Sequence, residues 1–279
     1  MTLELTTEQR DYIAEYIRSG TRSGPLFAPW PGEMLARAKV AHTALRSALV
    51  AEVRRREGHV KLPVAPHADE LRAMTRKRVD AMVRGFFPRI EQEAVLSLLE
   101  RSVVFLTSDS IERILHEESF GSSAWTLANL YLTSVGAESL GDGTERLLGL
   151  SQETTCFVTA RYLQGRGRFD DYLVHEAAHV FHNWKREYAG MPYTRTKEWL
   201  LPVDFSMREQ FAFACEVYSR IVEQAKAQQD RLALFAEYSS NPFAGDDDVH
   251  VHLDILREAV VARNGWRRIL ERCKASAGG

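Results

Sequence analysis

Apolar residues recur at intervals of three and four along most of this 279-residue chain, and this spacing favours a largely helical fold. The clearest case is residues 33–56, where one helical stripe is formed by Met34, Ala38, Ala41, Leu45, Leu49 and Val53. The same kind of spacing predicts helices over residues 6–17, 69–86, 90–106, 110–116, 170–186, 207–227 and 249–274, the last with a break at Gly265.

One segment departs from the helical period. Residues 154–162 read T-T-C-F-V-T-A-R-Y between Gly149 and the pair Gly165 and Gly167. Their β-branched and aromatic side chains are typical of a strand. As an edge strand, this segment could pair with an extended polypeptide. The predicted fold class is therefore mainly α with a small β-sheet, an α+β protein.

The composition excludes several classes of protein and does not indicate a particular binding partner. Lys and Arg total 36 against 38 Asp and Glu, for a net charge of -2. The three cysteines are widely spaced and form no C-x-x-C pair, so neither a disulfide scaffold nor a cysteine zinc site is predicted. Residues 1–10 lack the pattern of a signal peptide, and residues 120–137 are too polar for a membrane span. We expect a cytoplasmic protein without membrane association.

Residues 37–89 are strongly basic, with 13 Lys and Arg against 5 Asp and Glu. One interpretation is a solvated helical face beside a more acidic half. The other is a docking surface for nucleic acid or an acidic partner. No recognised nucleic-acid motif accompanies the charge, so nucleic-acid binding is not the expectation.

The residues that carry chemistry are the H-E-x-x-H sequence His175-Glu176-Ala177-Ala178-His179. Residues four apart share one face of a helix, so His175 and His179 can point at the same ion. Neutral imidazole is a common zinc ligand. Glu176 lies about 100° further round the helix, where it could take a proton from the water that the metal activates.

Other residues near the motif have more than one interpretation. Asp170 or Asp171 could cap the motif helix or orient a ligand histidine. His182 lies two turns from His175, about 10 Å by helix rise, which is too far for all three histidines to share one ion on a straight helix. It could instead contact a ligand, face substrate or be exposed.

The chain resembles the zincin metallopeptidases, in which a strand precedes the H-E-x-x-H helix and a later helix adds a third ligand. The resemblance covers residues 154–224 and implies a zincin-like metallopeptidase domain over 121–279, preceded by a helical N-terminal region over 1–120. Metzincins are disfavoured by His182 and Lys185, which stand where those enzymes have Gly and a His or Asp.

A gluzincin takes a glutamate as its third ligand, and two glutamates compete for that place. Glu209-Gln210-Phe211-Ala212 is similar to the E-x-F-A segment of zinc aminopeptidases, which favours Glu209. Glu216 is the alternative third ligand. Ser206 and Glu209 also match a capping box, and if Glu209 only closes its helix, Glu216 becomes the ligand.

The resemblance implies a Zn²⁺-dependent peptidase with Glu176 as general base and a peptide or protein as substrate. No segment resembles the motif with which aminopeptidases hold a free amino terminus, so an endopeptidase is favoured. It also implies a group that stabilises the oxyanion, for which the candidates are Tyr193, Tyr218, His250 and His252. The alternative is a regulatory or interaction protein on a zincin scaffold, with the basic helical face as its working part.

Overall fold

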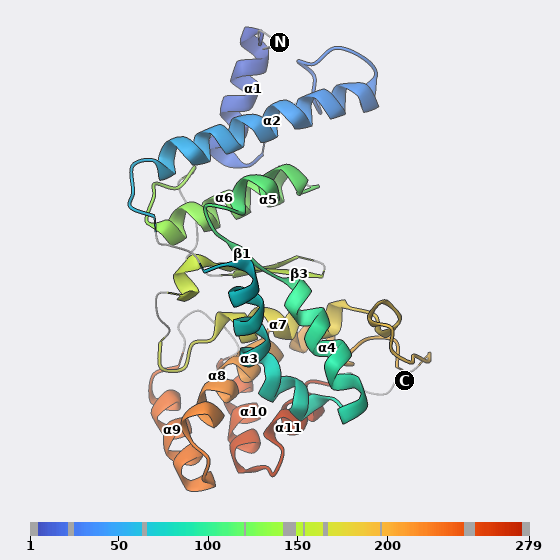
Figure 1. Cartoon of the computed structure of the whole chain (residues 1–279), viewed down its shortest axis with the longest axis vertical. Helices are drawn as coiled ribbons and strands as arrows, with labels where there is room; N and C mark the ends of the chain where they lie inside the picture. The colour runs from blue at the N-terminus through green and yellow to red at the C-terminus, as the bar shows by residue number, and fades with distance from the viewer. Residues whose placement is uncertain are drawn as a thin grey trace. The chain divides into compact units, whose positions relative to one another are not determined.

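The computed structural model describes residues 5–21, 25–62, 66–119, 121–141, 149–152, 154–163, 167–195, 197–242 and 249–274. The protein is mainly helical with one small sheet, which confirms the predicted fold class (Figure 1). Its α-helices are α1 (Thr7–Ser19), α2 (Met34–Glu57), α3 (Ala68–Phe86), α4 (Arg89–Ser102), α5 (Ile111–Glu117), α6 (Gly121–Val135), α7 (Tyr172–Asn183), α8 (Arg208–Gln224), α9 (Gln228–Ser240), α10 (Val249–Val261) and α11 (Gly265–Cys273). The strands are β1 (Val103–Leu106), β2 (Gly149–Gln152) and β3 (Thr155–Thr159), and the 3₁₀ helices are η1 (Ala160–Leu163), η2 (Arg186–Ala189) and η3 (Phe205–Met207).

The chain folds into two compact units, each built from separate stretches of sequence. Unit 1 comprises Met1–Ala65, Phe105–Leu148 and Thr159–Arg161, and unit 2 comprises Pro66–Val104, Gly149–Val158 and Tyr162–Gly279. The predicted division into a helical N-terminal region over 1–120 and a zincin-like domain over 121–279 stays a prediction.

The small sheet corrects the expectation that residues 154–162 form an edge strand. Its strand order is β1-β3-β2, so β3 is the central strand and its backbone groups are taken by neighbours on both sides. The segment predicted as an edge strand therefore has no free edge to offer. β2 pairs antiparallel with β3, and Leu150 is opposite Phe157.

The helix predicted over 90–106 is four residues too long. α4 ends at Ser102, and the next four residues form β1. The sequence V-V-F-L is apolar enough to continue a buried helical face, but its β-branched pair also suits a strand. Hydrogen bonding to β3 decides between the two.

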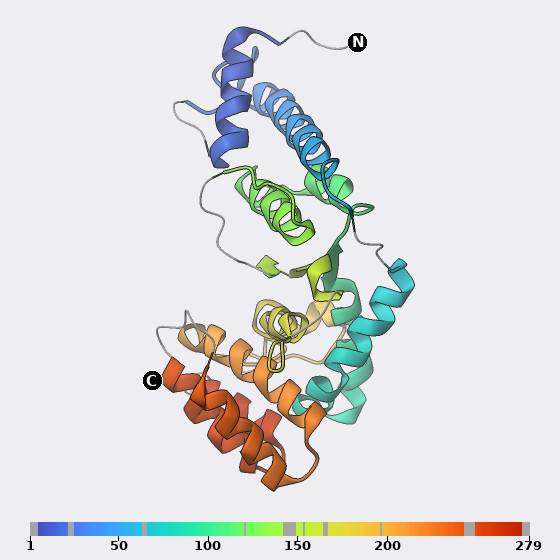
Figure 2. The same ribbon diagram turned by 90° about the vertical axis from the view of Figure 1, so that its left-hand side faces the viewer.

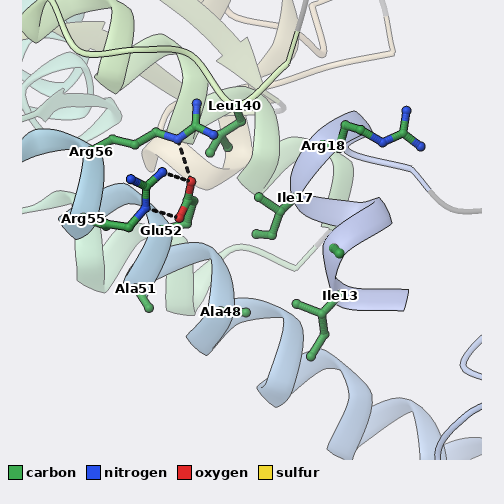
Figure 3. A pocket seen from close by; sticks show the side chains of 10 residues that line it. Ile13, Ile17, Arg18, Ala48, Ala51, Glu52, Arg55, Arg56 and Leu140 are labelled. Carbon is green, nitrogen blue, oxygen red and sulfur yellow. Dashed lines mark hydrogen bonds and ion pairs between the residues drawn. The ribbon is translucent and has the colours of Figure 1, made fainter. Parts of the chain in front are cut away.

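Unit 1 packs α2 against α1, α5 and α6 (Figure 2). The predicted stripe of α2 is buried at Ala41, Leu45, Leu49 and Val53, whereas Met34 at its start is 78% exposed. A hollow of about 600 Å³ opens between α1 and α2. Figure 3 shows its apolar side chains and the arginines beside them; the lining residues are Ile13, Ala14, Ile17, Arg18, Ala48, Ala51, Glu52, Arg55, Arg56 and Leu140.

Much of the charge in the basic stretch is compensated by carboxylates. Ion pairs join acidic side chains to Arg54, Arg55, Arg56, Arg72, Arg76, Arg78 and Arg84. Glu52 forms ion pairs with both Arg55 and Arg56, and hydrogen bonds from these two arginines lower the pKa of Glu52 to about 2. The choice between a solvated helical face and a docking surface stays a prediction. Among the described helices, none is both long and apolar enough to cross a bilayer.

Unit 2 surrounds α8 with helices α7, α10 and α11 (Figure 2). Aromatic rings fill the space between α3, α7 and α8, where Phe86 meets both Phe181 and Phe211. The predicted break at Gly265 is present between α10 and α11. A side chain there is excluded, because a Cβ on Gly265 would lie 2.2 Å from the Tyr218 ring.

Candidate metal centre

The H-E-x-x-H residues lie on α7, a helix whose N-terminus is capped. Asp171 is its N-cap, and the carboxylate accepts a hydrogen bond from the backbone N–H of Val174 at 3.4 Å. This confirms the capping role expected of Asp170 or Asp171. Most of the helix is buried, because apolar residues surround the motif on several sides. The motif histidines are therefore held on a rigid element rather than on a loop.

α8 brings a carboxylate to the same place. Its N-cap is Met207, which makes no side-chain cap, and Ser206 instead donates to Asp204. The capping box proposed for Ser206 and Glu209 is therefore absent, which leaves Glu209 free to turn toward α7. α7 and α8 pack directly against each other, and Ala212, three residues after Glu209, is small and fully buried.

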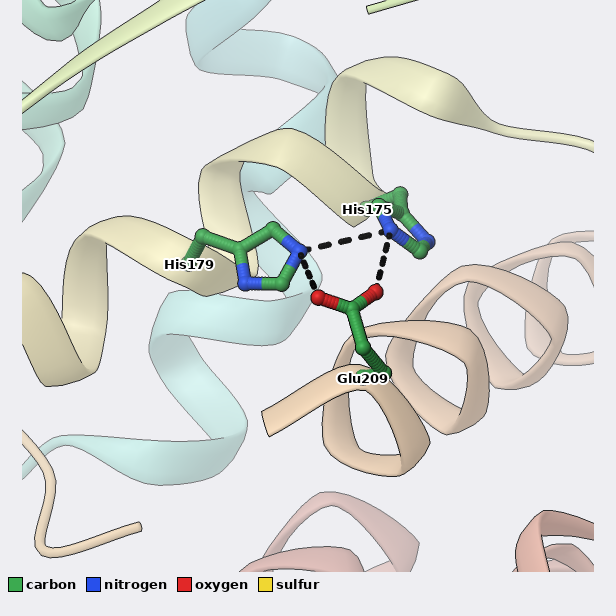
Figure 4. Close-up of side chains that lie close together, drawn as sticks. All are labelled: His175, His179 and Glu209. Atoms are coloured by element: carbon green, nitrogen blue, oxygen red, sulfur yellow. Dashed lines mark hydrogen bonds and ion pairs between the residues drawn. The ribbon is translucent and has the colours of Figure 1, made fainter. Parts of the chain in front are cut away.

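His175, His179 and Glu209 meet across these two helices (Figure 4). The Nε2 atoms of the two histidines are 3.4 Å apart. One carboxylate oxygen of Glu209 is 3.7 Å from Nε2 of His175, and the other is 3.6 Å from Nε2 of His179. The three predicted residues are thus a group that could hold a metal ion.

These separations fit a small tetrahedral cation. Ligand atoms at about 2.0–2.1 Å from zinc and at tetrahedral angles lie roughly 3.3–3.5 Å from one another. The two histidine nitrogens are 3.4 Å apart, which is that value, and each of them lies 3.6–3.7 Å from a different oxygen of Glu209. One ligand atom from each of the three residues can be chosen so that all lie within 4.8 Å of one another. Two imidazoles and a carboxylate are also a ligand set that zinc accepts while keeping a further position open.

The other ring nitrogen of each histidine is occupied, which directs Nε2 toward the shared centre. Glu216 accepts from Nδ1 of His175 at 3.1 Å. Nδ1 of His179 is 3.1 Å from Nε2 of His182, whose own Nδ1 is 3.0 Å from Oδ1 of Asn183. A consistent proton arrangement has each Nδ1 donating along this chain. His182 is buried, so of its three interpretations the contact with a ligand is the one present.

Glu216 is locked in place by a buried network. One of its oxygens accepts from the backbone N–H of Asp171 at 2.7 Å, while the other faces His175. The Asp171 carboxylate accepts from Tyr162 at 2.8 Å and pairs with Arg78 of α3. Sequence patterns gave no signal for Arg78 and Tyr162, because both are remote from the motif along the chain.

We expect Arg78→Met to destabilise the fold by about 3–5 kcal/mol, the usual cost of removing one partner of a buried ion pair. The reason is that the Asp171 side chain has no exposed surface and would lose its cation. Urea unfolding followed by circular dichroism measures the change. Arg76→Met is the matched control on α3, because Arg76 pairs with Glu93 and Glu100 nearer the surface. Equal losses in both variants would contradict the prediction.

The surroundings of the site shift the pKa values of His175 and His179 in opposite directions. Burial lowers the pKa of His175, but hydrogen bonds to Glu209 and Glu216 outweigh it and raise the pKa to about 10. Burial and the neighbouring His175 charge lower the pKa of His179 to about 3. Burial and the charge of Arg208 lower the pKa of His182 to about 4. Two carboxylates thus concentrate negative charge at His175, an environment that favours a cation.

Glu176 stands next to His175 on α7 and is 8% exposed. Its backbone carbonyl accepts from Cys156 of β3 at 2.9 Å, which ties the motif helix to the sheet. Because of its offset round the helix, Glu176 is not one of the three clustered ligands. This position is compatible with the predicted general base.

The four predicted oxyanion candidates lie in different surroundings, and their role stays a prediction. Tyr218 packs against Trp266, and Tyr193 and His250 are exposed. His252 is fully buried, hydrogen-bonds to Tyr238 at 3.0 Å and approaches the Phe213 ring at 5.8 Å. The Phe213 ring in turn contacts His175.

The connection between α7 and α8 displays aromatic side chains on its surface. The large exposed aromatics of the described residues all lie in this connection: Tyr188, Tyr193, Trp199 and Phe205. The connection joins the two helices that supply the metal group.

Comparison of the chain with protein-family models, with curated proteins and with solved structures finds no match. The class of protein that the fold and the site define is therefore a mainly helical protein with a His-His-Glu group able to bind a metal ion.

Proposed function

We propose that the protein is a zinc-dependent peptidase of the gluzincin type, with His175, His179 and Glu209 as ligands and Glu176 as general base. The observation that carries the proposal is the meeting of both motif histidines and Glu209 within metal-binding distance of one another. A structural zinc site needs no general base, so the buried carboxylate of Glu176 beside it favours catalysis.

A zinc ion bound there would supply a Lewis acid that makes water acidic near neutral pH. Glu176 accepts the proton of the attacking water and passes it to the nitrogen of the leaving amine, as the scissile C–N bond breaks. Glu216 and His182 hold the two ligand rings in position through their Nδ1 atoms. The exposed aromatic side chains between α7 and α8 provide a surface for a peptide or protein substrate, and endopeptidase cleavage is the favoured activity.

We expect each chain to bind one zinc ion tightly, and chelation to remove both the zinc and the hydrolysis of labelled casein. A ligand that binds only the folded state also raises the unfolding temperature, so zinc should raise the Tm of the metal-free protein. Elemental analysis and calorimetry make these measurements. Protein that holds no zinc and keeps its Tm on adding zinc would refute the proposed metal centre.

The alternative function is an interaction protein on a zincin scaffold, working through its basic helical half. Activity of Glu176→Gln separates the two, because an interaction protein gains nothing from this carboxylate. The three cysteines are buried and form no disulfide with one another, and the cytoplasmic location stays a prediction.

A further inference from the structure

We propose that the hollow between α1 and α2 binds a small amphiphilic carboxylate, an anion free in solution that carries one carboxylate head on a short alkyl tail. The hollow belongs to unit 1, whereas the metal group belongs to unit 2. The inference therefore goes beyond the proposed peptidase function and does not depend on it.

The walls of the hollow are apolar over most of their length. Ile13 and Ile17 lie one turn apart on α1, and Ala48 and Ala51 lie one turn apart on α2 (Figure 3). All four side chains are half-buried or exposed, so these walls stay open to solvent. The alanines are short and leave a space of about 600 Å³. An alkyl tail in this space would remove apolar surface from water, which is favourable.

Positive charge gathers at one end of the hollow. Arg55 and Arg56 come one turn after Ala51 on α2, and Figure 3 shows them together with Glu52 at this end. Arg18 adds a third cationic side chain from α1. Among the lining residues that the structure describes, Glu52 is the single carboxylate. An anionic head group complements this excess of positive charge.

Glu52 holds the two arginines of α2 in place. Its carboxylate accepts hydrogen bonds from Arg55 at 2.7 and 2.8 Å and from Arg56 at 2.7 Å. Arg56 also donates to the backbone carbonyls of Glu138 and Ser139. Within the described part of the chain, Nη1 of Arg55 and Nη2 of Arg56 make no hydrogen bond. Each guanidinium is thus ordered and keeps a donor for an anion, which lowers the entropy lost on binding.

The size of the hollow favours a small molecule over a partner helix. Small-molecule sites usually measure about 300–1,000 Å³, and the volume of about 600 Å³ lies in this range. A helix about 10–12 Å wide fills roughly 400–600 Å³ with a single turn, whereas a helix bound in a groove uses anchors spread over about two turns. One charged end and one apolar end also match a molecule with one head and one tail.

Isothermal titration calorimetry with octanoate tests the site in the whole chain. We expect a Kd of about 1 mM or tighter. Butanoate should bind roughly 10- to 20-fold more weakly, because each of its four missing methylenes is worth about a factor of two when half-buried. 1-Octanol has the same tail without the charge and should bind about 10-fold more weakly than octanoate. Absence of octanoate binding, or equal affinities for octanoate and 1-octanol, would overturn the proposal.

A substitution inside the hollow locates the bound anion. Ala51→Glu adds a second carboxylate where the head group should lie, and we expect it to weaken octanoate by more than about 10-fold. Ala36→Glu is the matched control, because it makes the same change at an exposed position of α2 that does not line the hollow. Equal octanoate affinities in these two variants would overturn the proposal by placing the anion elsewhere.

A second pair of variants tests the head-group end. Arg55→Gln should weaken octanoate by about 3- to 10-fold, since it removes an exposed guanidinium from this end. Arg113→Gln on α5 is the control and should keep wild-type affinity. The two arginine side chains are 58% and 61% exposed, and each pairs with a glutamate of its own helix, so both variants should keep the wild-type Tm. Unchanged octanoate affinity in Arg55→Gln would contradict the place given to the carboxylate head.

Discussion

The Glu176→Gln variant is expected to keep its zinc and its fold. Its rate of hydrolysis should fall by about 10²- to 10⁴-fold, the range that a general base contributes. The amide has nearly the shape of the carboxylate but cannot accept a proton. Because Glu176 lies outside the clustered ligand atoms, the substitution should leave the metal group in place. Elemental analysis and cleavage of labelled casein give the two readouts.

The control for this variant is Glu187→Gln, which changes an exposed glutamate of η2 and should keep full activity. His175→Ala is the opposite reference, because it removes a ligand and should lose the metal. A Glu176→Gln protein that resembles His175→Ala in its zinc content would contradict the role of general base.

The second large effect concerns the third ligand. Glu209→Gln should lower zinc affinity by more than about 100-fold, since it removes the negative charge that faces both Nε2 atoms. Glu216→Gln should cost about 10- to 100-fold, as changes to groups that orient a metal ligand do. Glutamine has one acceptor oxygen, so it can keep only one of the bonds to Asp171 and His175. Competition with a fluorescent chelator measures both affinities.

These two variants control each other, because they make the same chemical change seven residues apart on one helix. Near wild-type affinity in Glu209→Gln, together with loss of zinc in Glu216→Gln, would reverse the assignment. The two histidines and Glu176 would keep their roles in that case. Similar losses in both would show that neither carboxylate alone dominates zinc binding.

Local periodicity was enough to predict most helices of this protein. The buried stripe of α2 follows from residue spacing and the break at Gly265 from the low helix propensity of glycine, and both of these act over a few residues. The helix prediction was wrong at residues 103–106, because an apolar tetrapeptide suits a helix as well as a strand. Pairing with β3, which is some fifty residues away in sequence, makes it a strand.

The two histidines could be paired from sequence alone, because four residues bring them to one helix face whatever surrounds the helix. The carboxylate could not be chosen in the same way. Glu209 and Glu216 are seven residues apart, so they share a face of α8 but lie about 10 Å apart along it. Only the packing of α8 on α7 decides that Glu209 faces the Nε2 atoms while Glu216 faces Nδ1 of His175. The support from Arg78 likewise depends on a tertiary contact, because no local spacing relates this residue to the motif.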